Sequence, residues 1–91
     1  MTKRVLITGD KGFIGQWVVR KLAAEGFQTE GFDVVDGCDI HDARSLVQKM
    51  DGCNAVVHLA AIEEEQSPTR TMETNLQGTW NVLCSAKETS V

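Results

Sequence analysis

The 91-residue chain contains no tyrosine, one proline and only 5% aromatic residues. The absence of tyrosine excludes any mechanism in which this chain alone uses a phenol as acid or base. No apolar stretch approaches the ~20 residues that are needed to cross a membrane, so we expect no membrane partner. We also expect no signal peptide, because Met1-Thr2-Lys3-Arg4 leads into only a short apolar run before Thr8.

Basic charge and metal-binding cysteine patterns are also lacking. The formal net charge is −4, whereas binding a nucleic-acid backbone requires a basic face. Cys38, Cys53 and Cys84 are odd in number and lack the spacing of metal sites. We interpret them as free thiols in a reducing cytosol and the acidic run at 63–65 as a solvated loop rather than a metal site. The prediction is a cytoplasmic protein without metal or nucleic acid.

The most informative feature that is present is a glycine-rich segment, Thr8-Gly9-Asp10-Lys11-Gly12-Phe13-Ile14-Gly15. A short apolar run precedes it and a helical pattern follows, which is the context of a nucleotide pyrophosphate site. Gly9 permits a tight turn, Gly12 lets the backbone approach a pyrophosphate, and Gly15 lets the helix pack closely. The N-terminus of the helix adds N–H donors and partial positive charge.

The hydrophobic pattern alternates between strands and helices along the chain. The predicted strands are Lys3–Ile7, Gln28–Asp33, a short one within Val34–Cys38, and Asn54–Ala61. The predicted helices are Phe13–Glu25, one capped by Asp42 that runs to Met50, and a long one that Ser67-Pro68 opens. We expect residues 1–91 to form one α/β half-domain of Rossmann type. It would have about four parallel strands in the order 3-2-1-4 and helices on both faces.

Two of these helices have an apolar stripe on one face, at helical spacing. The stripe of the first helix is Ile14, Val18, Val19 and Leu22, and that of the last helix is Met72, Leu76, Thr79, Leu83 and Ala86. Gly78 lies inside the last helix, where glycine costs about 1 kcal/mol relative to alanine. We therefore expect a packing reason for this glycine.

Asp33 closes the second strand, 18 residues after Gly15. A carboxylate at this place accepts hydrogen bonds from both ribose hydroxyls and repels a 2′-phosphate, which favours NAD over NADP. Asp36 competes for this role, although its position suits a turn better. Lys11 either adds a charged contact to a phosphate or points to solvent, and we favour solvent. A contact from Lys11 to a 2′-phosphate would undermine the NAD assignment.

Together these motifs resemble the N-terminal part of the extended short-chain dehydrogenase/reductases, the NAD-dependent epimerase/dehydratases of nucleotide sugars. The matching residues are Thr8-Gly9-x-x-Gly12-Phe13-Ile14-Gly15, Asp33, Asp39-Ile40, His58-Leu59-Ala60-Ala61 and Asn75-Leu76-x-Gly78-Thr79-x-Asn81. The resemblance covers nearly the whole chain. It implies hydride transfer between a sugar carbon and the nicotinamide in a full-length relative.

The resemblance also implies site residues. Asp39 and Ile40 would contact adenine, Leu59-Ala60-Ala61 would pass under the pyrophosphate and nicotinamide ribose, and Asn75 would border the catalytic centre. We interpret His58 as structural. The expected cofactor-binding residues are Gly9, Lys11, Gly12, Phe13, Ile14, Gly15, Asp33, Asp39, Ile40, Leu59, Ala60, Ala61 and Asn75.

The chain departs from the family pattern because it has no Tyr-x-x-x-Lys pair and no substrate domain. We therefore expect a truncated chain without catalytic residues that holds the cofactor portion of an oxidoreductase. The alternatives are a stand-alone nucleotide-binding or interaction module, and a half-enzyme completed by another chain. Truncation would leave the edge of the fourth strand, Ala55–Leu59, exposed, so we expect a homo-oligomer that covers it.

Overall fold

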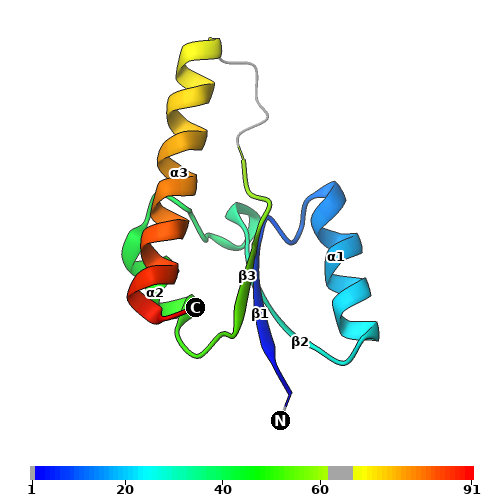
Figure 1. The fold of residues 1–91 in the computed structure, drawn as a ribbon. Coiled ribbons are helices and arrows are strands. Elements are labelled where there is room, and N and C mark those ends of the chain that lie inside the picture. Colours follow the sequence, from blue (N-terminus) through cyan, green and yellow to red (C-terminus); the bar gives the residue numbers. More distant parts are fainter. Residues whose placement is uncertain (1, 62–66) are drawn as a thin grey trace.

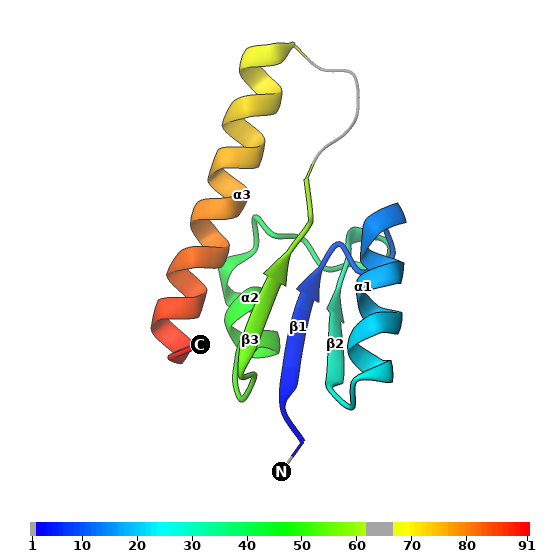
Figure 2. The same ribbon diagram turned by 45° about the vertical axis from the view of Figure 1, so that its right-hand side comes forward.

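A computed structural model describes residues 2–61 and 67–91 of the chain. Its centre is a parallel sheet of strands β1 (Arg4–Thr8), β2 (Gln28–Phe32) and β3 (Ala55–His58), in the order β2-β1-β3 (Figures 1 and 2). The apolar residues of β1 are buried, as expected for a central strand covered on both faces. Thr8 pairs with Phe32 on one side and with His58 on the other. The carboxyl ends of all three strands therefore lie side by side.

Helices cover both faces of this sheet, as predicted. Helix α1 (Phe13–Ala24) lies on one face, and α2 (Ala43–Met50) and α3 (Pro68–Thr89) lie on the other (Figure 1). The predicted caps are confirmed: the Asp42 side chain accepts from the Ser45 amide, and the Ser67 side chain accepts from the Arg70 amide. The chain thus has a Rossmann-type parallel α/β fold.

The short strand predicted within Val34–Cys38 is wrong. Residues Val34–Asp36 form a 3₁₀ helix, η1, which begins after Asp33. The Asp33 carboxylate accepts from the Val35 amide at 2.9 Å, and this local bond draws the backbone out of an extended conformation. The segment predicted as the fourth strand is therefore β3, and the sheet has three strands in the order β2-β1-β3 rather than about four in the order 3-2-1-4.

The last strand is also shorter than predicted. Strand β3 ends at His58 rather than at Ala61, because β1 turns away at Gly9 and offers no further partner. The Leu59 amide still donates to the Thr8 carbonyl at 3.0 Å. Residues 59–61 thus leave the sheet close to the glycine-rich turn.

The main hydrophobic core lies between the sheet and the α2/α3 layer. Its buried residues are Leu6, Phe32, Ile40, Leu46, Met50, Cys53 and Val82. On the opposite face, Gly15 is the only buried residue of α1. Ile14, the first residue of the apolar stripe of this helix, is 62% exposed. Gly15 sets this orientation, because it is the residue of α1 that packs against the turn.

The apolar stripe of α3 is only partly buried: Thr79 and Ala86 are half-buried, and Ala86 packs against the core. Met72, Leu76 and Leu83 are exposed, whereas Gly78, Val82 and Ser85 are buried. A Cβ on Gly78 would lie 3.0 Å from Ile40 Cγ1 and still closer to Ile40 Cδ1. This close approach selects the face of α3 that meets the core, and it confirms the expected packing reason for Gly78.

Candidate functional site

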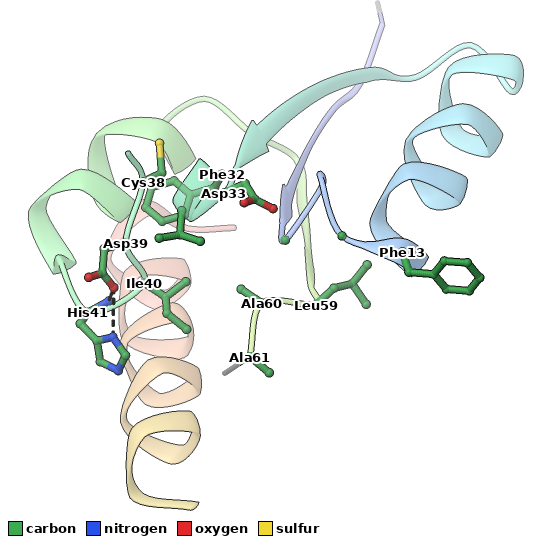
Figure 3. Close-up of a pocket in the computed structure, with 13 residues that line it drawn as sticks. Phe13, Phe32, Asp33, Cys38, Asp39, Ile40, His41, Leu59, Ala60 and Ala61 are labelled. Atoms are coloured by element: carbon green, nitrogen blue, oxygen red, sulfur yellow. Dashed lines mark hydrogen bonds and ion pairs between the residues drawn. The ribbon is translucent and has the colours of Figure 1, made fainter. Parts of the chain in front are cut away.

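A cavity of about 450 Å³ opens at the carboxyl ends of the three strands (Figure 3). Ligands of open α/β sheets bind at the carboxyl ends of the strands. Four segments surround the cavity: the glycine-rich turn, the end of β2, the segment 38–41 and the segment 59–61. The lining residues are Gly9, Gly12, Phe13, Phe32, Asp33, Val34, Cys38, Asp39, Ile40, His41, Leu59, Ala60 and Ala61.

The glycine-rich turn is built from close backbone contacts. Gly9 has a φ of 75°, a left-handed conformation that favours glycine, and its amide donates to the Phe32 carbonyl at 2.8 Å. A Cβ on Gly9 would lie 2.9 Å from the Ala60 amide nitrogen. A Cβ on Gly15 would overlap the Gly9 carbonyl oxygen and lie 2.8 Å from Asp10 Cα. Side chains at these two positions would push the turn apart.

The N-terminus of α1 faces this turn without a side-chain cap. Gly12 is the N-cap residue, and the first turn of the helix has no acidic residue. The free N–H groups and the helix dipole at such an end favour an anion. This end of the cavity is therefore suited to phosphate groups.

Asp33 joins the turn to the end of β2. The residue is 8% exposed, and its carboxylate accepts from the Lys11 amide at 3.0 Å and from the Val35 amide at 2.9 Å. Lys11 contributes its backbone amide to this hydrogen bond, and the residue itself is exposed and does not line the cavity. Asp36, the competing acid, is also exposed and outside the lining.

The segment with Asp39 and Ile40 lies against one stripe of α3. His41 Nε2 lies 3.0 Å from the Thr74 carbonyl oxygen, and Asn81 Nδ2 donates to the Ile40 carbonyl at 3.1 Å. Gly78 lies between these two positions of the helix and receives the Ile40 side chain. Thr74, Gly78 and Asn81 follow one another at spacings of four and three residues, so they share one helix face. Helix α3 therefore supports this side of the cavity.

Asp39 is held by its neighbour His41. The His41 amide donates to Asp39 Oδ1 at 2.9 Å, and His41 Nδ1 lies 3.0 Å from the same oxygen. The backbone hydrogen bond from His41 is the main cause that lowers the pKa of Asp39, and the His41 ring adds a smaller lowering against the effect of burial. Asp39 is therefore a carboxylate at neutral pH.

His58 connects β1, β3 and α3. Thr8 Oγ1 accepts from the Leu59 and Ala60 amides at 3.0 and 3.2 Å, so its own hydrogen is donated to His58 Nδ1, 2.6 Å away. The hydrogen on Nε2 then points to Thr79 Oγ1 at 3.1 Å. Burial lowers the pKa of His58. The ring is therefore neutral and structural.

The structure brings most of the predicted residues together at the cavity. Those that line it are Gly9, Gly12, Phe13, Asp33, Asp39, Ile40, Leu59, Ala60 and Ala61. Those that do not line it are Lys11, Ile14, Gly15 and Asn75. The lining residues that were not predicted are Phe32, Val34, Cys38 and His41. Each of these adjoins Asp33 or the Asp39-Ile40 pair, so proximity in sequence to a predicted residue was the available signal.

The described ranges 2–61 and 67–91 contain no group of three or more His, Cys, Asp or Glu side chains that could hold a metal ion. The same ranges contain no helix that is long and apolar enough to cross a membrane. The acidic run at 63–65 lies outside the described residues.

The parallel sheet, the uncapped helix after a glycine-rich turn and the acid at the end of β2 define the class of Rossmann-type dinucleotide-binding folds. Residues 5–91 match the NAD dependent epimerase/dehydratase family, and the chain belongs to this family.

Relatives and solved structures of this family are much longer than the chain. Human sterol-4-alpha-carboxylate 3-dehydrogenase, decarboxylating, is 30% identical over 98% of the chain but only 27% of its own length. The dTDP-glucose 4,6-dehydratase of Streptomyces venezuelae with bound NAD is 30% identical, with a TM-score of 0.79 over 97% of the chain and 37% of that protein. The UDP-glucose 4-epimerase of Thermus thermophilus in complex with NAD is 26% identical, with a TM-score of 0.80 over 97% of the chain and 35% of that protein. The chain thus spans about a third of the proteins it matches.

Proposed function

We propose that this chain binds NAD and is the cofactor-binding part of an oxidoreductase of the epimerase/dehydratase family. The observation that carries the proposal is Asp33, a buried carboxylate between the glycine-rich turn and the end of β2. The NAD complexes of the dehydratase and the epimerase, which share the fold, support the choice of cofactor.

The residues at the cavity fit a dinucleotide from end to end. The pyrophosphate would lie at the N-terminus of α1, beside Gly9 and Gly12, where side chains are absent and N–H donors are free. Asp33 would accept from the adenosine ribose hydroxyls, and Ile40 with Asp39 would border the adenine. Ala60 and Ala61 leave room on the nicotinamide side. When bound, the cofactor would supply hydride-transfer chemistry.

Calorimetric titration with NAD tests the proposal, with Asp33→Asn as the variant and Asp36→Asn as its matched control. Loss of the charge at Asp33 removes a charge-assisted acceptor, so NAD should bind about tenfold more weakly. Asp36 is exposed and outside the cavity lining, so Asp36→Asn should bind NAD like the unchanged chain. A folded sample that gives no heat and no thermal shift with millimolar NAD contradicts the proposal.

The same titration with NADP separates the two cofactors. The Asp33 carboxylate repels a 2′-phosphate, so NADP should bind more weakly than NAD to the unchanged chain. Asp33→Asn should reduce the difference in affinity between NAD and NADP. Tighter binding of NADP than of NAD to the unchanged chain would indicate that Lys11 contacts the 2′-phosphate.

We further propose that the oxidoreductase acts on nucleotide sugars. Support comes from the dehydratase and the epimerase, whose names specify dTDP-glucose and UDP-glucose. Reaction would require a second segment with the Tyr-x-x-x-Lys pair, which this chain does not contain. Mixing the chain with a separate chain that bears this pair, and following NADH absorbance with a nucleotide sugar, tests completion in trans. No turnover at any ratio of the two chains contradicts completion in trans.

The exposed edge of the sheet supports the expectation of a homo-oligomer. β3 is an outer strand of the β2-β1-β3 sheet, and unpaired strand edges are sites of association. We propose that a second copy covers β3. Light scattering at high concentration should give a mass above that of one chain, and a monomeric mass would contradict the proposal.

A further inference from the structure

A side chain of α3 binds the backbone of the segment that borders the cavity at Asp39 and Ile40. Asn81 Nδ2 donates to the Ile40 carbonyl at 3.1 Å, although the two residues are 41 positions apart in the sequence. A carbonyl can only accept, so the nitrogen end of the Asn81 amide must face it. The oxygen end accepts from Gln77 Nε2 at 3.1 Å, four residues earlier on the same helix. Both ends of the Asn81 amide are therefore engaged, and its orientation is fixed.

The hydrogen bond from Asn81 also orients the Asp39 carboxylate. The Ile40 carbonyl and the His41 N–H belong to one planar peptide group, so fixing the direction of the carbonyl fixes that of the N–H. The His41 N–H donates to Asp39 Oδ1 at 2.9 Å. A continuous chain of hydrogen bonds thus runs from α3 through this peptide group to a carboxylate that lines the cavity.

The Ile40 side chain is held at the same place on α3. Ile40 is buried, and the lack of a side chain at Gly78 leaves room for its Cδ1 against the helix. Gly78 and Asn81 are three residues apart and share one helix face. Figure 3 shows the segment with Asp39, Ile40 and His41 beside this helix. Helix α3 therefore fixes both the backbone and the side chain of Ile40.

We propose that Asn81 is a positioning residue for the adenine base of the cofactor: its amide holds the peptide group between Ile40 and His41, and this group orients the Asp39 carboxylate toward the base. This inference rests on the NAD-binding function proposed above. Asn81 is not among the residues that line the cavity, so it acts on the base through Asp39 and Ile40. The pyrophosphate end of the cavity depends instead on the glycine-rich turn and the N-terminus of α1.

The proposal predicts a change in base preference, which a merely structural residue would not cause. A carboxylate accepts a hydrogen bond from the exocyclic amine of adenine, but hypoxanthine carries a carbonyl at that position and offers no such donor. The probes are therefore NAD and nicotinamide hypoxanthine dinucleotide, which differ in this part of the base alone. The unchanged chain should bind NAD more tightly than the hypoxanthine analogue.

Asn54 provides a matched control at the opposite end of the sheet. Its Oδ1 accepts from the Arg4 amide at 2.8 Å, so it too joins a side-chain amide to the backbone of a distant segment. Arg4 begins β1, whereas the cavity lies where β1 ends. Asn54→Ala and Asn81→Ala each remove one hydrogen bond of this kind, but only Asn81→Ala should alter base preference.

The test is calorimetric titration of the unchanged chain and both variants with the two dinucleotides. Asn81→Ala should bind NAD roughly threefold to tenfold more weakly, the effect of one lost hydrogen bond. Its affinity for the hypoxanthine analogue should change little, so the preference for NAD should decrease by a similar factor. Asn54→Ala should keep both the affinities and the preference of the unchanged chain.

Asn81→Asp is a second variant, which covers the case in which Asn81→Ala does not fold. It keeps the size of the side chain, but an ionised carboxylate can only accept and cannot bind the Ile40 carbonyl. It should lose base preference as Asn81→Ala does. Amide NMR spectra without ligand establish the folding of each variant.

The outcomes separate the inference from the proposed function. Absence of binding of either dinucleotide to the unchanged chain contradicts the proposed function, and the inference with it. If the unchanged chain binds both, three results contradict the inference alone: no preference for NAD, an unaltered preference in the Asn81 variants, or equal weakening of both dinucleotides in those variants. Failure of both Asn81 variants to fold also contradicts it, because Asn81 would then support the whole fold rather than the base.

Discussion

The glycine-rich turn and the 39–41 segment border the same cavity, but different interactions hold them in place. The turn depends on backbone contacts: Gly9 lies against Ala60, and Gly15 lies against the Gly9 carbonyl. The 39–41 segment instead depends on side-chain contacts with α3: the His41 ring meets Thr74, the Ile40 side chain meets Gly78, and the Asn81 side chain donates to the Ile40 carbonyl. Backbone atoms in close contact cannot move aside for an added Cβ, whereas a side chain can rotate away from it. The two sides should therefore respond differently to substitution.

Gly15→Ala should have the largest effect on stability. The new Cβ would overlap the Gly9 carbonyl oxygen and lie 2.8 Å from Asp10 Cα, and neither atom can move without opening the turn. We expect the free energy of unfolding to fall by about 3 kcal/mol, measured by urea denaturation. That is a large fraction of the stability of a small domain.

Gly26→Ala at the other end of α1 is the control for Gly15→Ala. Gly26 has a φ of 89° but open space around its Cβ position, so only backbone strain of about 1 kcal/mol should result. Equal losses at the two positions would show that close backbone contact is not what holds the turn.

Gly78→Ala tests the side-chain contact and should have a smaller effect. The added Cβ meets Ile40 Cδ1, the tip of a side chain that can shift, and alanine favours a helix by about 1 kcal/mol. We expect a net loss of about 1 kcal/mol in the free energy of unfolding. Ile40→Val removes Cδ1, the nearer of the two Ile40 atoms that the added Cβ meets, so Gly78→Ala should cost less or become neutral in that background. Additive effects of the two substitutions would contradict direct contact between these residues.

This contrast also explains what could be predicted from the sequence. The glycine-rich turn and Asp33 are local features with a characteristic spacing, and the structure places both at the cavity. His41 was missed as a lining residue because its contact on α3, the Thr74 backbone carbonyl, lies 33 residues away. The apolar stripe of α3 does not mark the face that meets the core at Met72 and Leu76, because the fit of Gly78 to Ile40 determines the packing.

The strand predicted after Asp33 failed for a related reason. Two valines, Val34 and Val35, favour a strand by propensity. The Asp33 carboxylate instead accepts from the Val35 amide and starts η1. An acid that caps the following backbone outweighed the propensity of its neighbours.

His58 links the two sides, since its ring contacts Thr8 next to the turn and Thr79 on α3. Burial holds its pKa in the folded chain below the ordinary value of 6.5. As the pH falls, the unfolded chain therefore takes up the proton first, and the folded state loses stability. The contribution of His58 should be complete above about pH 6.5 and should decrease as the pH falls from there to the folded-state pKa.

Urea denaturation at about pH 7.5 and about pH 5.5 measures this dependence. The comparison is made in the His41→Gln background, so that His58 is the only histidine in the chain. Stability in that background should fall toward the lower pH, and His58→Gln should remove most of the fall. His58→Gln should also cost about 1 kcal/mol at the higher pH through the loss of a hydrogen bond. If stability still decreases toward the lower pH in His58→Gln, the link between the turn and α3 does not depend on a neutral His58 ring.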